Sequence, residues 1–247
     1  MSGAGAGAAP GLNPADRLAE LAGNLASLRE QISAACLAAG RDTAEVRLIA
    51  VTKTFPASDV LLLTRLGITD VGENRDQEAA PKAAECAAAG AGLRWHFVGQ
   101  LQVNKAASVV RYAYAVHSVD RPRLAAELGR RAVAAGRVIQ CLVQVSLDGE
   151  AGRGGALPDH VPGLADVVAG TDGLALAGVM AVAPLGAPAR PAYARLREIA
   201  ETVRSAHPQA GAISAGMSGD LGDAIAEGAT HVRIGTALLG GRRPFLR

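Results

Sequence analysis

One lysine ends an otherwise apolar run in the first quarter of the chain. Residues 46–56 read V-R-L-I-A-V-T-K-T-F-P, which places Lys53 directly after a stretch with the composition of a buried strand. An amine at the mouth of such a strand is shielded from water, and the neutral lysine amine that this favours can attack a carbonyl to form a Schiff base. The alternative is that the strand ends there and Lys53 begins a solvated loop.

Two glycine-rich segments near the other end of the chain carry small hydroxyl side chains. Residues 214–220 read S-A-G-M-S-G-D, and residues 233–239 read R-I-G-T-A-L-L. Glycines let the backbone approach an anion closely, and backbone N–H groups and hydroxyls donate hydrogen bonds to phosphate. We therefore expect a phosphate site formed by Gly216, Ser218, Gly235 and Thr236. The alternative is that Ser218 only caps a helix and Gly235 only turns the chain.

Arg233 stands two residues before Gly235. A phosphate site opposite a shielded lysine suits a phosphorylated aldehyde, of which pyridoxal 5'-phosphate (PLP) is the common one. Arg233 is then expected beneath the ring. Because an arginine does not give up its proton in a protein, it would donate a hydrogen bond to the pyridine nitrogen, keep that nitrogen unprotonated and weaken the ring as an electron sink. The alternative for Arg233 is a salt bridge at the rim.

Eight short apolar runs alternate with amphipathic segments, and they must position these groups. The runs are residues 46–51, 68–71, 93–98, 113–116, 138–145, 174–182, 212–214 and 231–234. Between them, segments such as 59–66, 75–89, 123–135, 192–206 and 220–227 carry apolar residues at three- and four-residue steps. This pattern predicts an α/β fold, a single closed parallel (β/α)8 TIM barrel whose strand ends meet at one face. An open doubly wound sheet is the alternative.

An extra N-terminal helix is expected before the first strand. Asn13 is a candidate N-cap, Pro14 takes the first helical position, and leucines follow at helical spacing towards Gly40. The expected organisation is a disordered Gly/Ala-rich tail over 1–12, which lacks the pattern of a secretory signal, and one barrel domain over 13–247.

Composition narrows the class of partner. The formal net charge of +2 favours neither nucleic acid nor a membrane as the main partner, and no apolar stretch reaches the ~20 residues that span a bilayer. The three cysteines are widely spaced, which indicates core residues in a reducing compartment rather than a metal or redox pair. We expect a cytoplasmic protein with a small-molecule partner and no metal.

Two histidines lie at the third and fourth apolar runs, because His96 falls within the third and His117 directly follows the fourth. In W-H-F-V-G, His96 alternates with aromatic residues along an expected strand. Each histidine is either a polar residue that faces the barrel interior or a core histidine with a hydrogen-bond partner, and the structural role is favoured. Lys105, in Q-V-N-K, is interpreted as a surface residue, with a second basic group near the mouth as the alternative.

Motifs along nearly the whole chain after the tail resemble the pyridoxal phosphate homeostasis proteins, which are alanine-racemase-like barrels. The matching segments are A-V-T-K-T-F-P at 50–56, V-G-E-N-R-D-Q-E at 71–78, W-H-F-V-G-Q-L-Q-V-N-K at 95–105, H-S-V-D at 117–120, V-Q-V-S at 143–146, G-V-M-A at 178–181, S-A-G-M-S-G-D at 214–220 and V-R-I-G-T at 232–236. Three positions depart from the expected pattern: Arg75 replaces an aromatic residue, Gln100 a histidine and Ala215 a methionine.

The resemblance implies a fold like the alanine racemase N-terminal domain, in a monomer that holds PLP as a covalent aldimine on Lys53. It also implies a role in vitamin B6 homeostasis, with PLP-dependent apoenzymes as transient partners. The cofactor-binding residues that it implies are Lys53, Asn74, Ser214, Gly216, Met217, Ser218, Arg233, Gly235 and Thr236. It places Arg233 at the pyridine nitrogen and Asn74 near the ring.

Whether the protein only carries PLP or uses it in catalysis depends on whether a second catalytic base is present. Racemases that resemble this barrel take a tyrosine from an additional β domain, and two-base racemisation needs proton donors on both faces of the substrate. Only eleven residues follow Thr236, so we predict a carrier with no catalytic residue. The alternatives are a PLP-dependent amino-acid racemase or lyase of the same fold, and a sugar-phosphate aldolase barrel whose lysine binds a substrate carbonyl directly.

Overall fold

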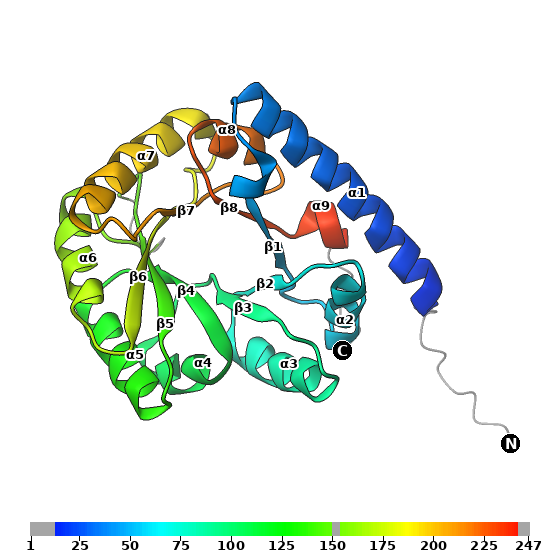
Figure 1. Cartoon of the computed structure of the whole chain (residues 1–247), viewed down its shortest axis with the longest axis horizontal. Helices are drawn as coiled ribbons and strands as arrows, with labels where there is room; N and C mark the ends of the chain where they lie inside the picture. Colours follow the sequence, from blue (N-terminus) through cyan, green and yellow to red (C-terminus); the bar gives the residue numbers. More distant parts are fainter. Residues whose placement is uncertain (1–12, 150–153, 242–247) are drawn as a thin grey trace, which may run out of the picture.

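Eight parallel strands pair in sequence order and close into a barrel, β1 with β8, in a computed structural model that describes residues 13–149 and 154–241 (Figure 1). The strands are β1 (Arg47–Val51), β2 (Asp70–Glu73), β3 (Arg94–Phe97), β4 (Ala113–Val119), β5 (Ile139–Gln144), β6 (Leu174–Met180), β7 (Ala212–Ser214) and β8 (His231–Ile234). The closed barrel is confirmed, and the open sheet is wrong. Residues 1–12, expected to be a disordered tail, lie outside the described residues.

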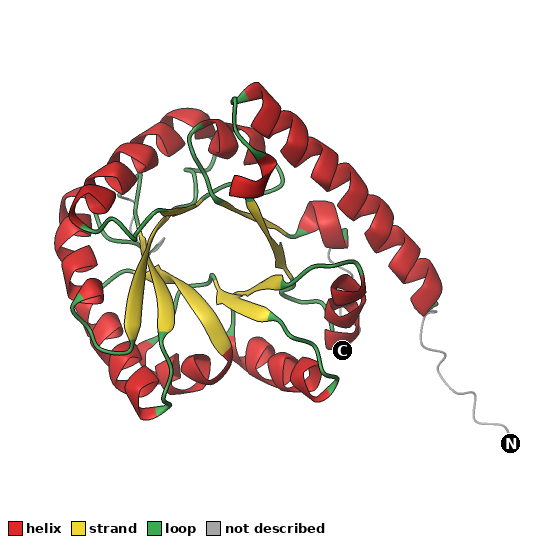
Figure 2. Ribbon diagram, viewed as in Figure 1, coloured by secondary structure: helices red, strands yellow, loops and turns green. Residues whose placement is uncertain are grey.

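Helices surround the strands (Figure 2). They are α1 (Pro14–Ala38), α2 (Ala57–Arg65), α3 (Asp76–Ala88), α4 (Ala106–Tyr112), α5 (Pro122–Ala134), α6 (Val161–Ala169), α7 (Ala189–Ala206), α8 (Leu221–Ala226) and α9 (Thr236–Leu239), with short 3-10 turns at Thr43–Glu45, Val103–Lys105 and Pro158–His160. None of the helices in the described ranges is long and apolar enough to cross a membrane.

The additional helix α1 lies across the seam between the last and first units of the barrel, against α2, α8 and α9 (Figure 1). The Asn13 side chain accepts a hydrogen bond from the Ala15 N–H at 2.9 Å, which confirms the expected N-cap. Arg17 then joins the helix to the first and last units of the barrel, because its Nη2 bonds Asp59 Oδ2 on α2 at 2.7 Å and the Leu239 carbonyl on α9 at 3.0 Å.

Alternation along each strand separates the barrel interior from the layer beneath the helices. Val71 and Val232 belong to the core packed under α1 and α2. Ile49 and Val51 face inward, and a Cβ on Gly72 would lie only 3.1 Å from Ile49 Cγ2. Barrel interiors are commonly filled with branched aliphatic side chains. Here four polar residues share that space, namely His96, His117, Ser214 and Arg233.

Candidate functional site

Lys53 follows the end of β1 by two residues and lies half-buried in the turn that leads to α2. The chain turns sharply there, because Thr54 adopts a positive φ of 70°, a conformation that costs energy for a β-branched residue. The loop after β8 lies against the same strand end. A Cβ on Gly235 would stand 3.3 Å from the Val51 carbonyl oxygen, so a glycine lets this loop approach closely. Residues far apart in sequence thus meet at the barrel mouth.

Hydrogen bonds join the two loops that were predicted to hold a phosphate. The Ser218 hydroxyl accepts from the Ala237 N–H at 3.3 Å, and the Gly216 carbonyl accepts from the Arg233 N–H at 2.9 Å. Gly216 has a φ of 91°, and a Cβ there would lie 2.7 Å from the Ala224 Cβ. The structure therefore brings Gly216 and Ser218 beside the segment that contains Gly235 and Thr236.

Asp220 organises the edge of this pair of loops. Its Oδ1 accepts from the Met217 N–H at 2.6 Å, and its Oδ2 accepts from the Tyr193 hydroxyl at 2.8 Å. Burial and the Asp220 carboxylate raise the pKa of Tyr193 above its usual range. The Met217 N–H is therefore already used within the loop, while the Met217 side chain is 38% exposed.

Arg233 is buried inside the barrel rather than paired with an acid at the rim. Its Nη1 donates to Ser214 Oγ at 2.7 Å and its Nη2 donates to the Ala181 carbonyl at 2.9 Å. Burial lowers the pKa of Arg233, although the guanidinium stays charged. No carboxylate forms an ion pair with Arg233 in the described part of the chain, so the geometry does not support the rim salt bridge.

The two histidines lie inside the barrel and bond each other. His117 Nε2 lies 2.8 Å from His96 Nδ1, and His117 Nδ1 lies 2.9 Å from Ser214 Oγ. His96 Nε2 is 2.9 Å from Asp70 Oδ1. Sequence alone could place each histidine on a strand, but it could not pair them.

A buried ion pair was missed from the sequence. Lys82, on α3, donates to Glu73 Oε1 at 2.6 Å and to the Thr52 carbonyl at 2.9 Å. The Thr52 hydroxyl donates to the same Glu73 oxygen at 2.6 Å. Burial raises the pKa of Glu73 against the opposing charge of Lys82. This cluster holds the residue that immediately precedes Lys53. In the sequence, a lysine among the glutamates of a helix is typical of a solvent-exposed residue. Only the regular apolar face of α3 could have indicated that Lys82 is buried.

Asn74 lines a cavity that includes none of the other predicted site residues. It follows β2 and lines a cavity of about 450 Å³ with Gln100 and Lys105. Gly99 packs on its backbone, since a Cβ on Gly99 would lie 2.2 Å from the Asn74 carbonyl oxygen. Among the described residues, no recorded hydrogen bond joins Asn74 to Arg233, so its place near a bound ring stays a prediction.

The chain matches the family model of the alanine racemase N-terminal domain over residues 23–243. The class is therefore that of the alanine-racemase-like barrels.

Relatives within this class are similar over almost their full length. A pyridoxal phosphate homeostasis protein of Mycobacterium tuberculosis is 45% identical over 92% of this chain and 95% of its own. The structure of PipY from Synechococcus elongatus with PLP bound is 35% identical, has a TM-score of 0.79, and is covered over 100% of its length by 89% of this chain. A crystal structure of an unknown protein from Bifidobacterium adolescentis is 32% identical with a TM-score of 0.84, over 90% of this chain and 96% of that one. The chain belongs to the pyridoxal phosphate homeostasis protein family.

Proposed function

We propose that this chain binds PLP at the barrel mouth, with Lys53 Nζ covalently joined to it, and that it buffers or delivers the cofactor. The single observation that carries the proposal is the meeting of the end of β1, which leads into the Lys53 turn, with the loop that begins at Gly235 directly after the β8 strand of Arg233. The similarity to PipY, whose structure has PLP bound, supports it. When bound, PLP supplies an aldehyde that condenses with an amine and a ring that delocalises electrons.

The residues present fit a phosphorylated aldehyde. Gly235 lets the loop after β8 lie close against the end of β1, and Ser218 already bonds an N–H of the facing segment, Ala237. Thr236 and Gly216 complete this cradle in the proposal. Arg233 uses two of its five N–H donors on Ser214 and Ala181, so further donors remain for the ring nitrogen. The fit of these groups supports Ser214, Met217 and Arg233 as surroundings of the cofactor.

Holding PLP is favoured over turning substrates over. Two-base racemisation needs a second group that takes and returns a proton opposite Lys53. Tyr193 is the tyrosine that the described structure ties to the mouth loops, and burial and Asp220 raise its pKa, so its hydroxyl stays protonated and is not available to take a proton. The match to the alanine racemase N-terminal domain favours a PLP-dependent racemase or lyase as the second candidate.

The setting of the proposed carrier is the cytoplasm, where it acts as a monomer and passes PLP to apoenzymes. The described helices include none able to cross a membrane, which supports this setting. The three cysteines, Cys36, Cys86 and Cys141, are free and buried, as expected in a reducing compartment.

A transfer assay tests the proposal. PLP-loaded protein, freed of unbound PLP, is mixed with a PLP-dependent apoenzyme, with and without a phosphatase that destroys free PLP. The proposal predicts that the apoenzyme regains activity without the phosphatase and that the protein alone converts neither D- nor L-alanine. Recovery in the presence of the phosphatase would indicate direct delivery, and its loss would indicate buffering through solution. Sustained racemisation or cleavage of amino acids by the protein would favour the second candidate instead.

A further inference from the structure

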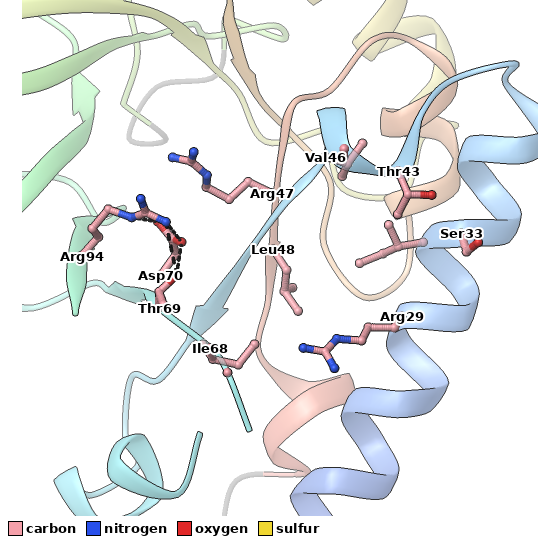
Figure 3. Close-up of a pocket in the computed structure, with 13 residues that line it drawn as sticks. Arg29, Ser33, Thr43, Val46, Arg47, Leu48, Ile68, Thr69, Asp70 and Arg94 are labelled. Atoms are coloured by element: carbon pink, nitrogen blue, oxygen red, sulfur yellow. Dashed lines mark hydrogen bonds and ion pairs between the residues drawn. The ribbon is translucent and has the colours of Figure 1, made fainter. Parts of the chain in front are cut away.

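A continuous chain of buried hydrogen bonds crosses the barrel interior below the proposed cofactor site. It runs from Arg233 through the Ser214 hydroxyl to His117, then to His96 and to Asp70. All five side chains are at least nine-tenths buried. The last member, Asp70, also binds the Arg94 guanidinium at 2.6 Å (Figure 3). This hydrogen-bond chain therefore begins at the Arg233 guanidinium and ends at the Asp70 carboxylate, which is paired with the Arg94 guanidinium.

The far end opens at the opposite face of the barrel from Lys53. Asp70 and Arg94 begin β2 and β3, and they line a cavity of about 560 Å³ between these strands and α1. Figure 3 shows the Arg94 guanidinium bonded to Asp70 and the Arg47 side chain reaching towards the same space. The chain thus links the two ends of the barrel.

The charged groups at the two ends determine which atom donates each hydrogen bond along this buried series. A guanidinium only donates, so Ser214 Oγ accepts from Arg233 and has its own proton left for His117 Nδ1. A neutral His117 then carries its proton on Nε2 and donates to His96 Nδ1. A neutral His96 likewise donates from Nε2 to the Asp70 carboxylate. The reverse order needs either a protonated Asp70 or a buried imidazolium.

Neither of these reversed states suits the surroundings. Burial alone would raise the pKa of Asp70, but hydrogen bonds from His96, Arg94 and Thr69 outweigh it and hold the pKa below its usual range. Burial lowers the pKa of both His96 and His117. Arg47 from β1, Arg94 from β3, and His231 and Arg233 from β8 also face the two histidines and oppose an imidazolium. Tyr114 from β4 packs its ring against His96.

We propose that His117 and His96 are positioning residues, which hold the Ser214 hydroxyl and through it the Arg233 guanidinium in one orientation towards the PLP ring nitrogen. This inference rests on the proposed function. A hydroxyl without a fixed proton acceptor could rotate, and Arg233 would lose its best-placed acceptor inside the barrel. The hydrogen-bond chain gives the Ser214 hydroxyl one orientation, because each of its other members donates its hydrogen bond in the same direction, from Arg233 towards Asp70.

The first test needs no cofactor. Nitrogen NMR of the imidazoles in PLP-free protein, assigned with His96→Gln and His117→Gln variants, reports where each proton lies. The expected result is a neutral ring with the proton on Nε2 for both histidines, unchanged between about pH 5.5 and 8. A proton on Nδ1 of His117, or a cationic His96 at neutral pH, would overturn the ordered chain.

The second test measures what the chain does for bound PLP. His117→Leu is expected to raise the Kd for PLP about tenfold and to shift the absorbance maximum of the bound cofactor. His117→Asn, which keeps an acceptor for the Ser214 hydroxyl, should recover part of both changes. The matched control is His231→Gln. The ring centroid of His231 lies 6.3 Å from that of His117 in the same interior, but His231 bonds Thr230 instead of this hydrogen-bond chain.

The outcomes separate the two proposals. If wild-type protein binds no PLP, the proposed function fails, and this inference fails with it. If wild-type protein binds PLP but His117→Leu leaves both Kd and spectrum unchanged, only the positioning role is overturned. Should His117→Leu not fold, Ser214→Ala removes a single oxygen from the same chain and is expected to shift the spectrum in the same direction.

Discussion

Two buried polar networks lie on opposite sides of the barrel wall, one ending at Arg233 and the other holding Thr52, the residue that precedes Lys53. The inner one is the hydrogen-bond chain from Arg233 to Asp70, whose middle members are neutral. The outer one lies between β2 and α3, where Lys82 and Glu73 form an ion pair that also holds Thr52. The outer network holds the backbone that carries Lys53, and the inner one is proposed to orient Arg233 towards the ligand. Their loss should therefore show up in different measurements.

The largest effect is expected from the outer network. Lys82→Met removes the cation and leaves the Glu73 carboxylate buried without it, which should lower the free energy of unfolding by about 3–5 kcal/mol. Urea unfolding monitored by circular dichroism measures the change. The double variant Lys82→Met/Glu73→Leu removes both charges and should recover most of the loss. A single-variant loss below about 1 kcal/mol would show that the pair does not hold this wall together.

The buried histidines of the barrel interior should make the protein sensitive to acid. Burial lowers the pKa of His231 to about 4, and burial lowers the pKa values of His96 and His117 as well. Below the unfolded-state pKa of about 6.5 the unfolded chain binds protons that the native state does not, so stability falls as the pH falls.

Each histidine should contribute a slope of up to about 1.4 kcal/mol per pH unit between its folded and unfolded pKa. Glu73, whose pKa is raised, acts in the opposite direction as a single group. Unfolding free energies measured from pH 7.5 to 4.5 check this, and His231→Gln should reduce the slope. A flat profile for the wild type would contradict the burial of neutral histidines.

Two variants that each remove one hydroxyl compare the networks at a similar expected loss of stability. Thr52→Val removes the donor to Glu73, and Ser214→Ala removes the link between Arg233 and His117. Each should destabilise the protein by about 1 kcal/mol, because each leaves buried partners unsatisfied. Only Ser214→Ala is expected to change the absorbance spectrum of bound PLP. Equal spectral changes in both variants would remove the distinction between the two networks.

Much of the architecture was predictable from the sequence because it depends on local pattern. The eight apolar runs and the helical spacing between them are repeated signals, and the N-cap at Asn13 depends on neighbouring residues. The helix α4, with seven residues, carried too little periodicity to be singled out. The fourth apolar run was predicted to end at residue 116, but β4 extends to Val119.

The candidate site was predictable only where strand order determines position. Lys53, Arg233 and Gly235 follow from the ends of β1 and β8, which pair only in the closed barrel. The pairing of His96 with His117 depends on the stagger of β3 against β4, where the register shifts, and no sequence pattern encodes that shift. Lys82 was missed because its acidic partner lies on another element. The contacts of these residues with PLP remain predictions.

Lys53 is proposed as the amine that holds the cofactor, and the chain has just three lysines among which to choose. Lys82 is committed to Glu73 and Thr52, whereas Lys105 lines the separate cavity beside Asn74. PLP-loaded protein should absorb near ~420 nm, lose that band with borohydride, and yield one modified peptide on mass spectrometry. We predict the modification on Lys53, its retention in Lys105→Ala and its absence in Lys53→Ala. A borohydride-fixed adduct on Lys82, Lys105 or the N-terminal amine, with Lys53 unmodified, would contradict this assignment.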